Sequence, residues 1–258
     1  MHDIHSNNII AFTARHAIVD IHYHMCYQIV VSMQTPFNCT IGGQTYAQIK
    51  GFLINQKVTH LCEALNTTVM VFFIDAESIV GWQIKEMLAG RPFLDIESIL
   101  SHEQLAIFTT ACAQADSANE MRKVADNLLE QILSLGTLRG NRIIDDRMVK
   151  ILEYIEANQH DSIVLEDIAE LVFLSPERAR HLFAQQTGIP FSQYLLWKRI
   201  KAVLTQVIGK NVPMINAILE NGFTDQAHFT HLFKRTFGVS AKLLLKNSRS
   251  IQFLKPQL

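Results

Sequence analysis

The side chains best suited to bind a small molecule or a metal ion lie in the first sixty residues. His22 and His24 are two residues apart, Gln28 follows them, and His60 lies further along the chain. Neutral imidazole can hydrogen-bond to an organic molecule or bind zinc, nickel or iron. We expect these four residues to form a binding site for a small organic molecule, and a metal ion held by the three histidines is the second interpretation.

Short strands are needed to bring these side chains together. Apolar and β-branched runs separated by turns fill the first part of the chain, and they predict a small β-barrel or jelly roll. Because alternate residues of a strand share a face, His22, His24 and Cys26 project together, as do His60 and Cys62. The expected strands are Ala17–His24, Tyr27–Met33, Phe37–Ile41, Gln44–Tyr46, Gly51–Ile54 and Thr67–Ile74.

Helical periodicity follows the strands and predicts helices near residues 76–88, 101–115 and 118–135. The last of them, expected over Asn119–Leu135, has one apolar face. That face predicts either a dimer contact or packing on the protein's own barrel, and both remain open. It consists of Met121, Val124, Leu128, Leu129, Ile132 and Leu135.

The C-terminal half contains an internal repeat, because residues 165–189 recur fifty positions later as residues 215–239. In each copy, apolar residues at helical spacing precede a short break and then a polar N-cap residue, Ser175 or Asp225. This is the pattern of a helix-turn-helix, present twice. The paired residues include Ile168 and Ile218, Glu170 and Glu220, Phe173 and Phe223, His181 and His231, Phe183 and Phe233, and Gly188 and Gly238.

Charge is divided unevenly along the chain, although the formal net charge is only −1. From residue 171 to the end there are 12 Lys and Arg against 3 Asp and Glu, whereas residues 1–170 contain 11 against 21. A basic region that carries two helical repeats is typical of a protein that binds the phosphate backbone of double-stranded DNA.

Helical spacing separates a packing face from an exposed face on the second helix of each repeat. We expect Arg180 to contact a base and Gln226 to pair with adenine, while Arg178, Lys234 and Arg235 hold phosphates. The full set expected to contact DNA is Glu177, Arg178, Arg180, His181, Gln226, Ala227, Thr230, His231, Lys234 and Arg235.

The motifs of this region, from about residue 145 to residue 246, resemble those of the AraC/XylS family of transcription regulators. The resemblance implies two helix-turn-helix units joined by a long helix, here about Ser192–Ile208, which would let one subunit read two major grooves about 34 Å apart. Ala241 and Val203 depart from the family's usual proline and alanine. The motifs are Leu165-Glu-Asp-Ile-Ala169, Leu174-Ser-Pro-Glu-Arg178, Asn221-Gly-Phe-Thr-Asp-Gln226 and Phe233-Lys-Arg-Thr-Phe-Gly-Val239.

The N-terminal half resembles the cupin-like sensor domain of the same family, through His22-x-His24, Gln28, Gly42-Gly43, Gly51 and His60. The resemblance implies a small effector inside the barrel. Metal-binding cupins use related histidines together with a carboxylate, but Gln28 stands near that position, so we expect no metal and no other cofactor. The alternative is a metal-dependent cupin-type enzyme or metal sensor fused to a DNA-binding domain.

The 258 residues, 48% of them hydrophobic, are enough for two cores. We expect an α+β two-domain fold, with a cupin-like barrel and trailing helices in residues 1–138, a linker in residues 139–144, and an all-α DNA-binding domain in residues 145–250. The first domain is expected to bind the effector and form a homodimer, and the second to bind promoter DNA.

The sequence also predicts the cellular location of the protein, the state of its cysteines and its functional class. The four cysteines form no CxxC pair, which favours reduced thiols. No stretch resembles a signal peptide or a membrane span, so we expect a soluble cytoplasmic protein. We expect a transcription regulator and not an enzyme, with RNA polymerase as a further partner if it is an activator.

Overall fold

The structure, a computed structural model, describes residues 9–135, 144–158 and 163–254, and the side chains up to residue 246. It divides into two compact units, one within residues 141–232 and one combining residues 7–140 with residues 233–258. The second unit therefore includes the end of the region 145–250 that was expected to belong to the DNA-binding domain. Residues 139–143 of the expected linker lie outside the described part of the chain.

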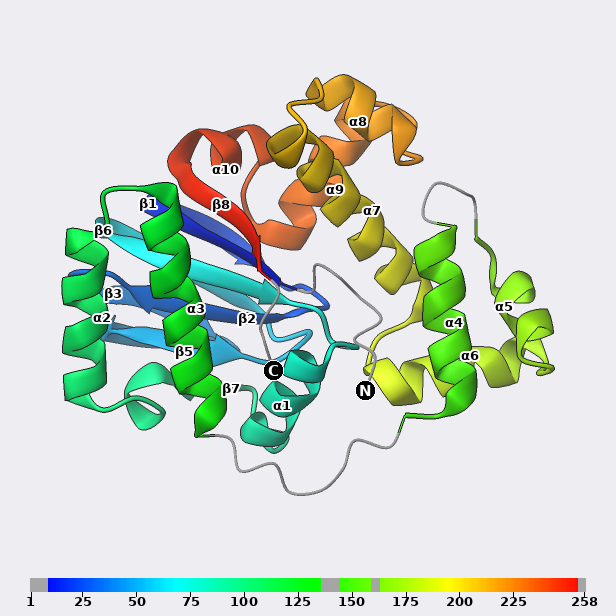
Figure 1. The fold of residues 1–258 in the computed structure, drawn as a ribbon, viewed down its shortest axis with the longest axis horizontal. Coiled ribbons are helices and arrows are strands. Elements are labelled where there is room, and N and C mark those ends of the chain that lie inside the picture. The colour runs from blue at the N-terminus through cyan, green and yellow to red at the C-terminus, as the bar shows by residue number, and fades with distance from the viewer. Residues whose placement is uncertain (1–8, 136–143, 159–162, 255–258) are drawn as a thin grey trace. The chain divides into compact units, whose positions relative to one another are not determined.

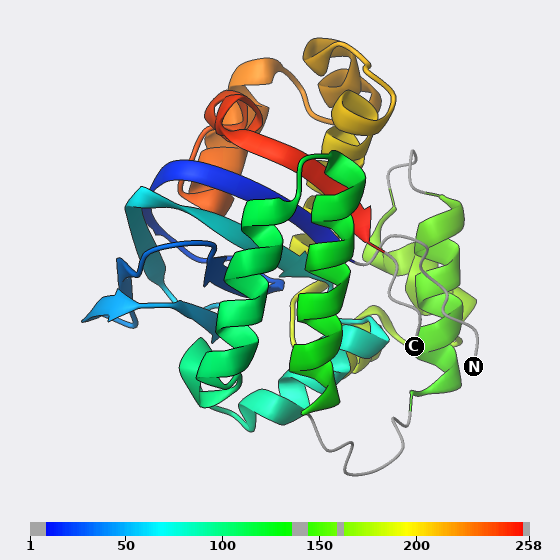
Figure 2. The same cartoon turned by 60° about the vertical axis from the view of Figure 1, so that its left-hand side comes forward.

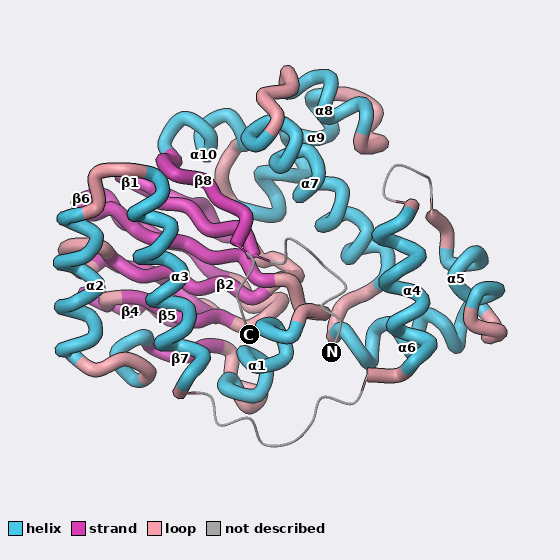
Figure 3. Tube along the Cα trace, in the orientation of Figure 1, coloured by secondary structure: helices cyan, strands magenta, loops and turns pink. Residues whose placement is uncertain are grey.

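The barrel unit is built on one antiparallel sheet that forms a nearly closed barrel (Figures 1 and 3). Neighbouring strands pair in the order β4-β3-β6-β2-β5-β7. In addition, β1 pairs with β6, and β8 pairs with β1. Six of these eight strands were predicted from the sequence. The short β7 and the C-terminal β8 were not. The strands are β1 Ile9–His22, β2 Tyr27–Ser32, β3 Phe37–Ile41, β4 Gln44–Ile49, β5 Gly51–Ile54, β6 His60–Ile74, β7 Phe93–Asp95 and β8 Ser248–Leu254.

The two longest strands, β1 and β6, pair along almost their whole length, and the register changes between Val19 and His22. Beyond this irregularity His22 lies directly opposite His60. A bulge re-aims the side chains that follow it, because the local pairing gains or loses a residue. The register of β1 and β6 thus brings two distant histidines together at one end of the barrel.

The sheet has one face covered by helices and one face turned inward. Tyr27, Ile29 and Val31 of β2 join the core with Met70 and Phe72 of β6. Strand residues between them point to the opposite face, as the two-residue period of a strand requires. The covering helices are α1 Ile79–Leu88, α2 His102–Gln114 and α3 Ala118–Ser134, and Figure 2 shows α2 and α3 side by side.

The apolar face of α3 packs on the protein's own barrel. Leu128, Leu129 and Ile132 are buried in the core, and Met121 and Val124 pack partly buried against it. Most of this face therefore packs within the protein, as the second interpretation expects, and a homodimer stays a prediction. Of the six residues, Leu135 alone remains exposed.

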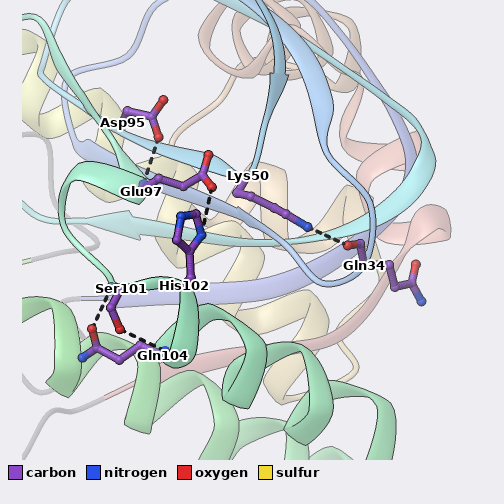
Figure 4. A network of polar contacts seen from close by, with 7 residues as sticks. All are labelled: Gln34, Lys50, Asp95, Glu97, Ser101, His102 and Gln104. Carbon is purple, nitrogen blue, oxygen red and sulfur yellow. Dashed lines mark hydrogen bonds and ion pairs between the residues drawn. The ribbon is translucent and has the colours of Figure 1, made fainter.

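Local capping fixes where α2 begins, as Figure 4 shows. The Ser101 hydroxyl accepts a hydrogen bond from the Gln104 amide, and the Gln104 side chain accepts one from the Ser101 amide. This capping box satisfies two backbone donors that the helix cannot satisfy itself. Just before it, the Asp95 carboxylate caps a short helical turn by accepting from the Glu97 amide.

The other unit is helical. A 19-residue helix, α7, follows the first helical pair and precedes the second, as predicted for the linker helix. The shared helix α9 begins in the helical unit and ends in the barrel unit. No helix within the described residues is long and apolar enough to cross a membrane. The helices of this unit are α4 Asp146–Ala157, α5 Leu165–Leu171, α6 Pro176–Thr187, α7 Phe191–Gly209, α8 Met214–Glu220 and the first part of α9 Gln226–Phe237, whereas α10 Ala241–Asn247 belongs to the barrel unit.

Candidate functional site

The first helical pair, α5 and α6, has the capping that the sequence predicts. The Ser175 hydroxyl accepts a hydrogen bond from the Arg178 amide, and Pro176 occupies the first position of α6. Gly188 ends the helix in the left-handed conformation, with φ of +77°. These residues fix both ends of α6 and hence the part of its surface that is exposed.

The second pair, α8 and α9, repeats the arrangement with one change in register. Asp225 caps α9 by accepting from the His228 amide at 2.7 Å, which confirms the equivalence with Ser175. The first helices, however, are offset by 49 residues and not by fifty, because α5 begins at Leu165 and α8 at Met214. The turn before α9 therefore contains one more residue than the turn before α6.

This shift corrects the pairing of residues before the second helices. The positive backbone φ of the turn falls at Phe173 in the first repeat and at Gly222 in the second. Phe173 is 93% exposed whereas Phe223 is 4% exposed, so the two phenylalanines are not equivalent. The pairs Ile168/Ile218 and Glu170/Glu220 are shifted by one in the same way, whereas the pairs within α6 and α9 hold.

All ten residues expected to contact DNA have exposed side chains, on α6 and α9. Their packing neighbours on the same helices are buried, notably Ala179 and Phe183 in α6 and Phe229 and Phe233 in α9. Each helix thus presents a polar surface and buries an apolar one, as the periodicity predicts. The ten residues are Glu177, Arg178, Arg180, His181, Gln226, Ala227, Thr230, His231, Lys234 and Arg235.

Glu177 organises the exposed face of α6. Its carboxylate pairs with the Arg180 guanidinium at 2.7 Å and with His181 Nε2 at 2.9 Å. Pairs three and four residues apart on a helix meet in this way, and exposed pairs contribute little to stability. The pair instead orients Arg180 along the helix. Glu177 thereby contacts two of the side chains that were expected to contact DNA.

In the barrel unit, Lys234 lies 3.2 Å from the Asp20 carboxylate of β1. Both side chains are well exposed, so the ion pair is weak and is broken easily by an anion such as a phosphate. Beside it, the Asp20 amide donates a hydrogen bond to the Gly238 carbonyl at 3.1 Å. The end of α9 is thus attached to β1 within the barrel unit.

A cavity of about 190 Å³ lies inside the barrel, against the inward face of the sheet. Its walls are mainly apolar, and residues from the end of α9 and from α10 complete them. Polar side chains reach it from His22, Gln28 and His60, while His24 is outside the lining. The apolar lining includes Phe12, Val30, Phe52, Val71 and Phe73 of the sheet and Phe237, Val239, Leu243 and Leu244 of the C-terminal segment.

Three of the four predicted effector residues meet in one cluster, and the fourth contacts two of them. The ring centroids of His22 and His60 are 4.1 Å apart, and those of His24 and His60 are 5.0 Å apart. The Gln28 side-chain oxygen lies 3.2 Å from His24 Nε2 and 2.9 Å from His60 Nε2. The four residues therefore meet as predicted, but the predicted strand Ala17–His24 ends at His22, so His24 reaches the cluster from the loop after β1 and Gln28 from β2.

Burial keeps these imidazoles uncharged. Desolvation, assisted by the neighbouring His24, lowers the pKa of His22 to about 3. Desolvation and the two other histidines lower the pKa of His60 to about 2, and desolvation also lowers the pKa of His24. A buried imidazole titrates low because the charged form loses its hydration. All three side chains are therefore neutral at physiological pH.

The predicted neighbours Cys26 and Cys62 do not complete this cluster. Cys62 lines the cavity, and the Cys26 sulfur lies 3.5 Å from His24 Nδ1, the ring nitrogen turned away from Gln28. Burial raises the pKa of the Cys62 thiol to about 12, so it remains a thiol. Within the described residues, the one group of three or more side chains that could hold a metal ion consists of His22, His24 and His60.

The residues of the C-terminal segment were missed as pocket residues. Their helical spacing in the sequence indicates a helical domain, and their contact with β1 joins distant parts of the chain. These residues are Phe237, Val239, Leu243 and Leu244. Arg15 and His16 also line the cavity and were not predicted. No local pattern marks either group.

Comparison with known proteins gives consistent matches. Residues 168–247 match the family model described as a helix-turn-helix domain. The probable transcriptional regulator LumQ of Photobacterium leiognathi is 21% identical over 85% of this chain and 89% of that protein. The arabinose operon regulatory protein of Escherichia coli is 32% identical, over 45% of this chain and 42% of that protein, so this match spans less than half of the relative.

Solved structures of ToxT from Vibrio cholerae share the fold over almost the whole chain. An apo form gives a TM-score of 0.62 at 12% identity, over 94% of this chain and 98% of that one. A ToxT structure bound to (E)-4-(8-methylnaphthalen-1-yl)but-3-enoic acid gives a TM-score of 0.55 at 14% identity, over 94% and 99%. At this identity the likeness shows the architecture, a barrel followed by helical pairs.

Proposed function

Because this chain is a transcription regulator of the AraC/XylS type, we propose that it binds promoter DNA by placing α6 and α9 in two successive major grooves. The observation that carries this is the repeated helical pair, with second helices of 12 residues each and exposed polar faces. Helix α7, whose 19 residues span about 28 Å, separates the two pairs by a distance of the order of the groove spacing, about 34 Å.

The proposed contacts follow from the side chains that each helix exposes. Arg180 and His181 of α6 and Gln226 and Thr230 of α9 reach base edges. Arg178, Lys234 and Arg235 contact phosphates, which set the register without reading sequence. Lys234 leaves Asp20 to do so, at little cost because the ion pair is exposed. Glu177 and Ala227 complete the surfaces that face the grooves.

We expect Arg180→Ala to weaken binding to the specific site by about 1–3 kcal/mol, because a bidentate arginine–guanine contact is worth that much discrimination. The measurement is a titration of the full chain against its operator and against random duplex DNA, at two salt concentrations. Arg122→Ala, which removes an exposed arginine of α3 in the other unit, is the matched control and should change neither affinity. Equal losses for both DNAs in Arg180→Ala would make Arg180 a phosphate contact.

We further propose that the barrel cavity binds a small organic effector. A structure of ToxT, which shares this fold, contains an organic acid that carries a large apolar group. The cavity here is also lined mainly by apolar side chains. The apolar body would occupy the space between the sheet and the C-terminal segment. Its polar end would meet Gln28, His22 and His60, with His24 behind them as support.

An effector that fills the cavity should stabilise the full chain, since any ligand that binds only the folded state does so. The expected gain is about 2.7 kcal/mol at a concentration one hundred times its Kd. Thermal unfolding with a series of monocarboxylic acids of increasing apolar length measures this. Gln28→Leu should abolish the shift, whereas Gln44→Leu, a surface substitution on β4, should keep it. A shift that survives Gln28→Leu would place the ligand elsewhere.

The same proposal assigns roles to the parts of the chain. Residues 1–138 would sense the effector and residues 145–250 bind DNA, and Phe237 and Leu244 would transmit occupancy because they belong to the cavity wall. We propose a cytoplasmic homodimer without enzymatic activity. If it is an activator, RNA polymerase is a further partner. The dimer contact would use a surface other than the apolar face of α3, which is buried.

A further inference from the structure

Three exposed histidines lie on the two helices that are proposed to enter the grooves of DNA. His181 is on α6, and His228 and His231 are on α9. Histidine is the side chain whose ordinary pKa, about 6.5, lies within the physiological pH range. A proton gained at any of these positions would add a positive charge where the helix meets DNA.

His181 has one of its ring nitrogens already engaged. Its Nε2 lies 2.9 Å from a carboxylate oxygen of Glu177, which can only accept, so Nε2 carries a hydrogen and donates it. In the neutral ring Nδ1 is then an acceptor. Phosphate oxygens and the N7 and O6 atoms of guanine are acceptors too, so Nδ1 can bond to them only after it gains a proton.

On α9, His228 was not among the residues expected to contact DNA. The second helices are offset by fifty residues, so His228 holds the position of Arg178, a proposed phosphate contact. It precedes His231 and Arg235 at spacings of three and four residues, which places the three side chains along one stripe of the helix. The Thr224 hydroxyl lies 2.9 Å from His228 Nδ1 and can either donate or accept, so it orients the ring in both protonation states.

Few anionic groups of the protein reach these rings. Glu177 is the charged partner of His181, and within the described residues no side chain of α4, α5 or α7 forms an ion pair with that ring. The two rings of α9 form no ion pair in this part of the chain either. A phosphate beside the rings would therefore supply the opposite charge that favours their protonated form. The charged side chains of α9 and of the turn before it are Asp225, Lys234 and Arg235, and Arg199 of α7 approaches the same turn at Gly222.

We propose that His181, His228 and His231 take up protons when α6 and α9 bind DNA, so that the affinity for DNA rises as the pH falls. The inference rests on the proposed function and assigns a regulation to the same surface. When the bound state holds more protons than the free state, affinity is greatest below the ordinary pKa range of histidine and is lost as the pH rises through it. The chain would then respond to acidity as well as to an effector.

The buried histidines of the barrel do not titrate in this range. Burial lowers the pKa of His22 to about 3 and that of His60 to about 2, and it lowers the pKa of His24 as well. These three rings stay neutral between about pH 5.5 and pH 8. A change in DNA affinity over this interval therefore does not arise from the barrel cluster.

The test uses a duplex selected from a random pool with the full wild-type chain. Fluorescence anisotropy measures its affinity at several pH values and salt concentrations. A ring whose pKa rises by one unit in the complex contributes about tenfold, so we expect the affinity to rise about tenfold or more from about pH 8 to about pH 5.5. The slope of log affinity against log salt concentration should steepen by about 2–3, since each added charge contributes about 0.9.

Variants identify the groups that take up the protons. The triple variant His181→Gln, His228→Gln and His231→Gln keeps a neutral polar side chain at each position. Its affinity should stay at every pH near that of the wild type at about pH 8. The control is His102→Gln, which replaces an exposed histidine of α2 in the barrel unit and should keep the full pH dependence (Figure 4).

The inference is overturned if the wild-type chain binds the selected duplex equally well at both ends of the pH interval. It is also overturned if the triple variant, shown by circular dichroism to be folded, keeps the pH dependence of the wild type. In both cases the proposed binding of DNA would stand. If the chain selects no duplex at any pH, the proposed function is wrong and this inference is wrong with it.

Discussion

Gly238→Ala is expected to destabilise the barrel unit by about 2–5 kcal/mol. The φ of Gly238 is +65°, which costs a residue with a side chain about 1–2 kcal/mol. An added Cβ would also overlap the Asp20 carbonyl oxygen and lie 2.8 Å from His22 Nδ1. Backbone cannot yield as a flexible side chain does, so overpacking adds about 1–3 kcal/mol. Urea unfolding of a Trp197→Phe background, where Trp82 of α1 remains as the fluorescent reporter, measures the change.

Gly43→Ala is the matched control. Its φ of +83° carries a similar conformational cost, but an added Cβ meets nothing within 4 Å. The expected loss is therefore about 1–2 kcal/mol from the backbone alone. If both variants lose the same amount, the close approach of Gly238 to β1 is not made in solution. The C-terminal segment would then not complete the cavity.

Phe183→Ala should destabilise the helical unit by about 3–5 kcal/mol, the usual cost of removing a buried aromatic ring. Phe183 is fully buried, and its ring lies 5.3 Å from that of Phe191 and 5.1 Å from that of Tyr194. These contacts hold α6 against α7. In a Trp82→Phe background, Trp197 of α7 reports the unfolding of this unit. DNA affinity should fall with it.

Phe173→Ala removes the same side chain from the turn before α6, where it is 93% exposed. It should change the free energy of unfolding by less than about 0.5 kcal/mol. The contrast tests the corrected register of the repeat, since a strict shift of fifty residues would pair Phe173 with the buried Phe223. A loss of several kcal/mol in Phe173→Ala would restore that pairing.

Local patterns in the sequence were sufficient for most of the fold. Alternating apolar residues predict six of the eight strands, and Ser175, Asp225, Gly188 and Gly238 mark the ends of the two second helices. The sequence also predicted that His22 and His24 would meet, because residues two apart on a strand share a face. In the structure β1 ends at His22, and His24 reaches the cluster from the following loop. That His22 pairs directly with His60 depends on a register change in β1, which no local pattern announces.

What the sequence could not show depends on contacts between distant segments. From the sequence alone, the apolar side of α3 is equally consistent with a dimer contact and with packing inside the protein. Only the position of the barrel beside it shows that it packs inside. Strand β8 pairs with β1 across more than two hundred residues. The one-residue shift between the repeats was hidden because isoleucine and glutamate recur at an offset of fifty, whereas the first helices are offset by 49. The helix bounds, the positive φ of Phe173 and Gly222 and the exposure of Phe173 reveal it.

Because α9 begins in one unit and ends in the other, there is no single peptide bond at which the two can be separated. A fragment that stops near residue 140 would lack Phe237, Leu244 and β8, and its cavity would be open to solvent. A fragment that starts near residue 145 would expose the same apolar residues and tend to aggregate. A chimera that joins this barrel unit to the helical domain of another protein would therefore have to keep the last 26 residues of this chain.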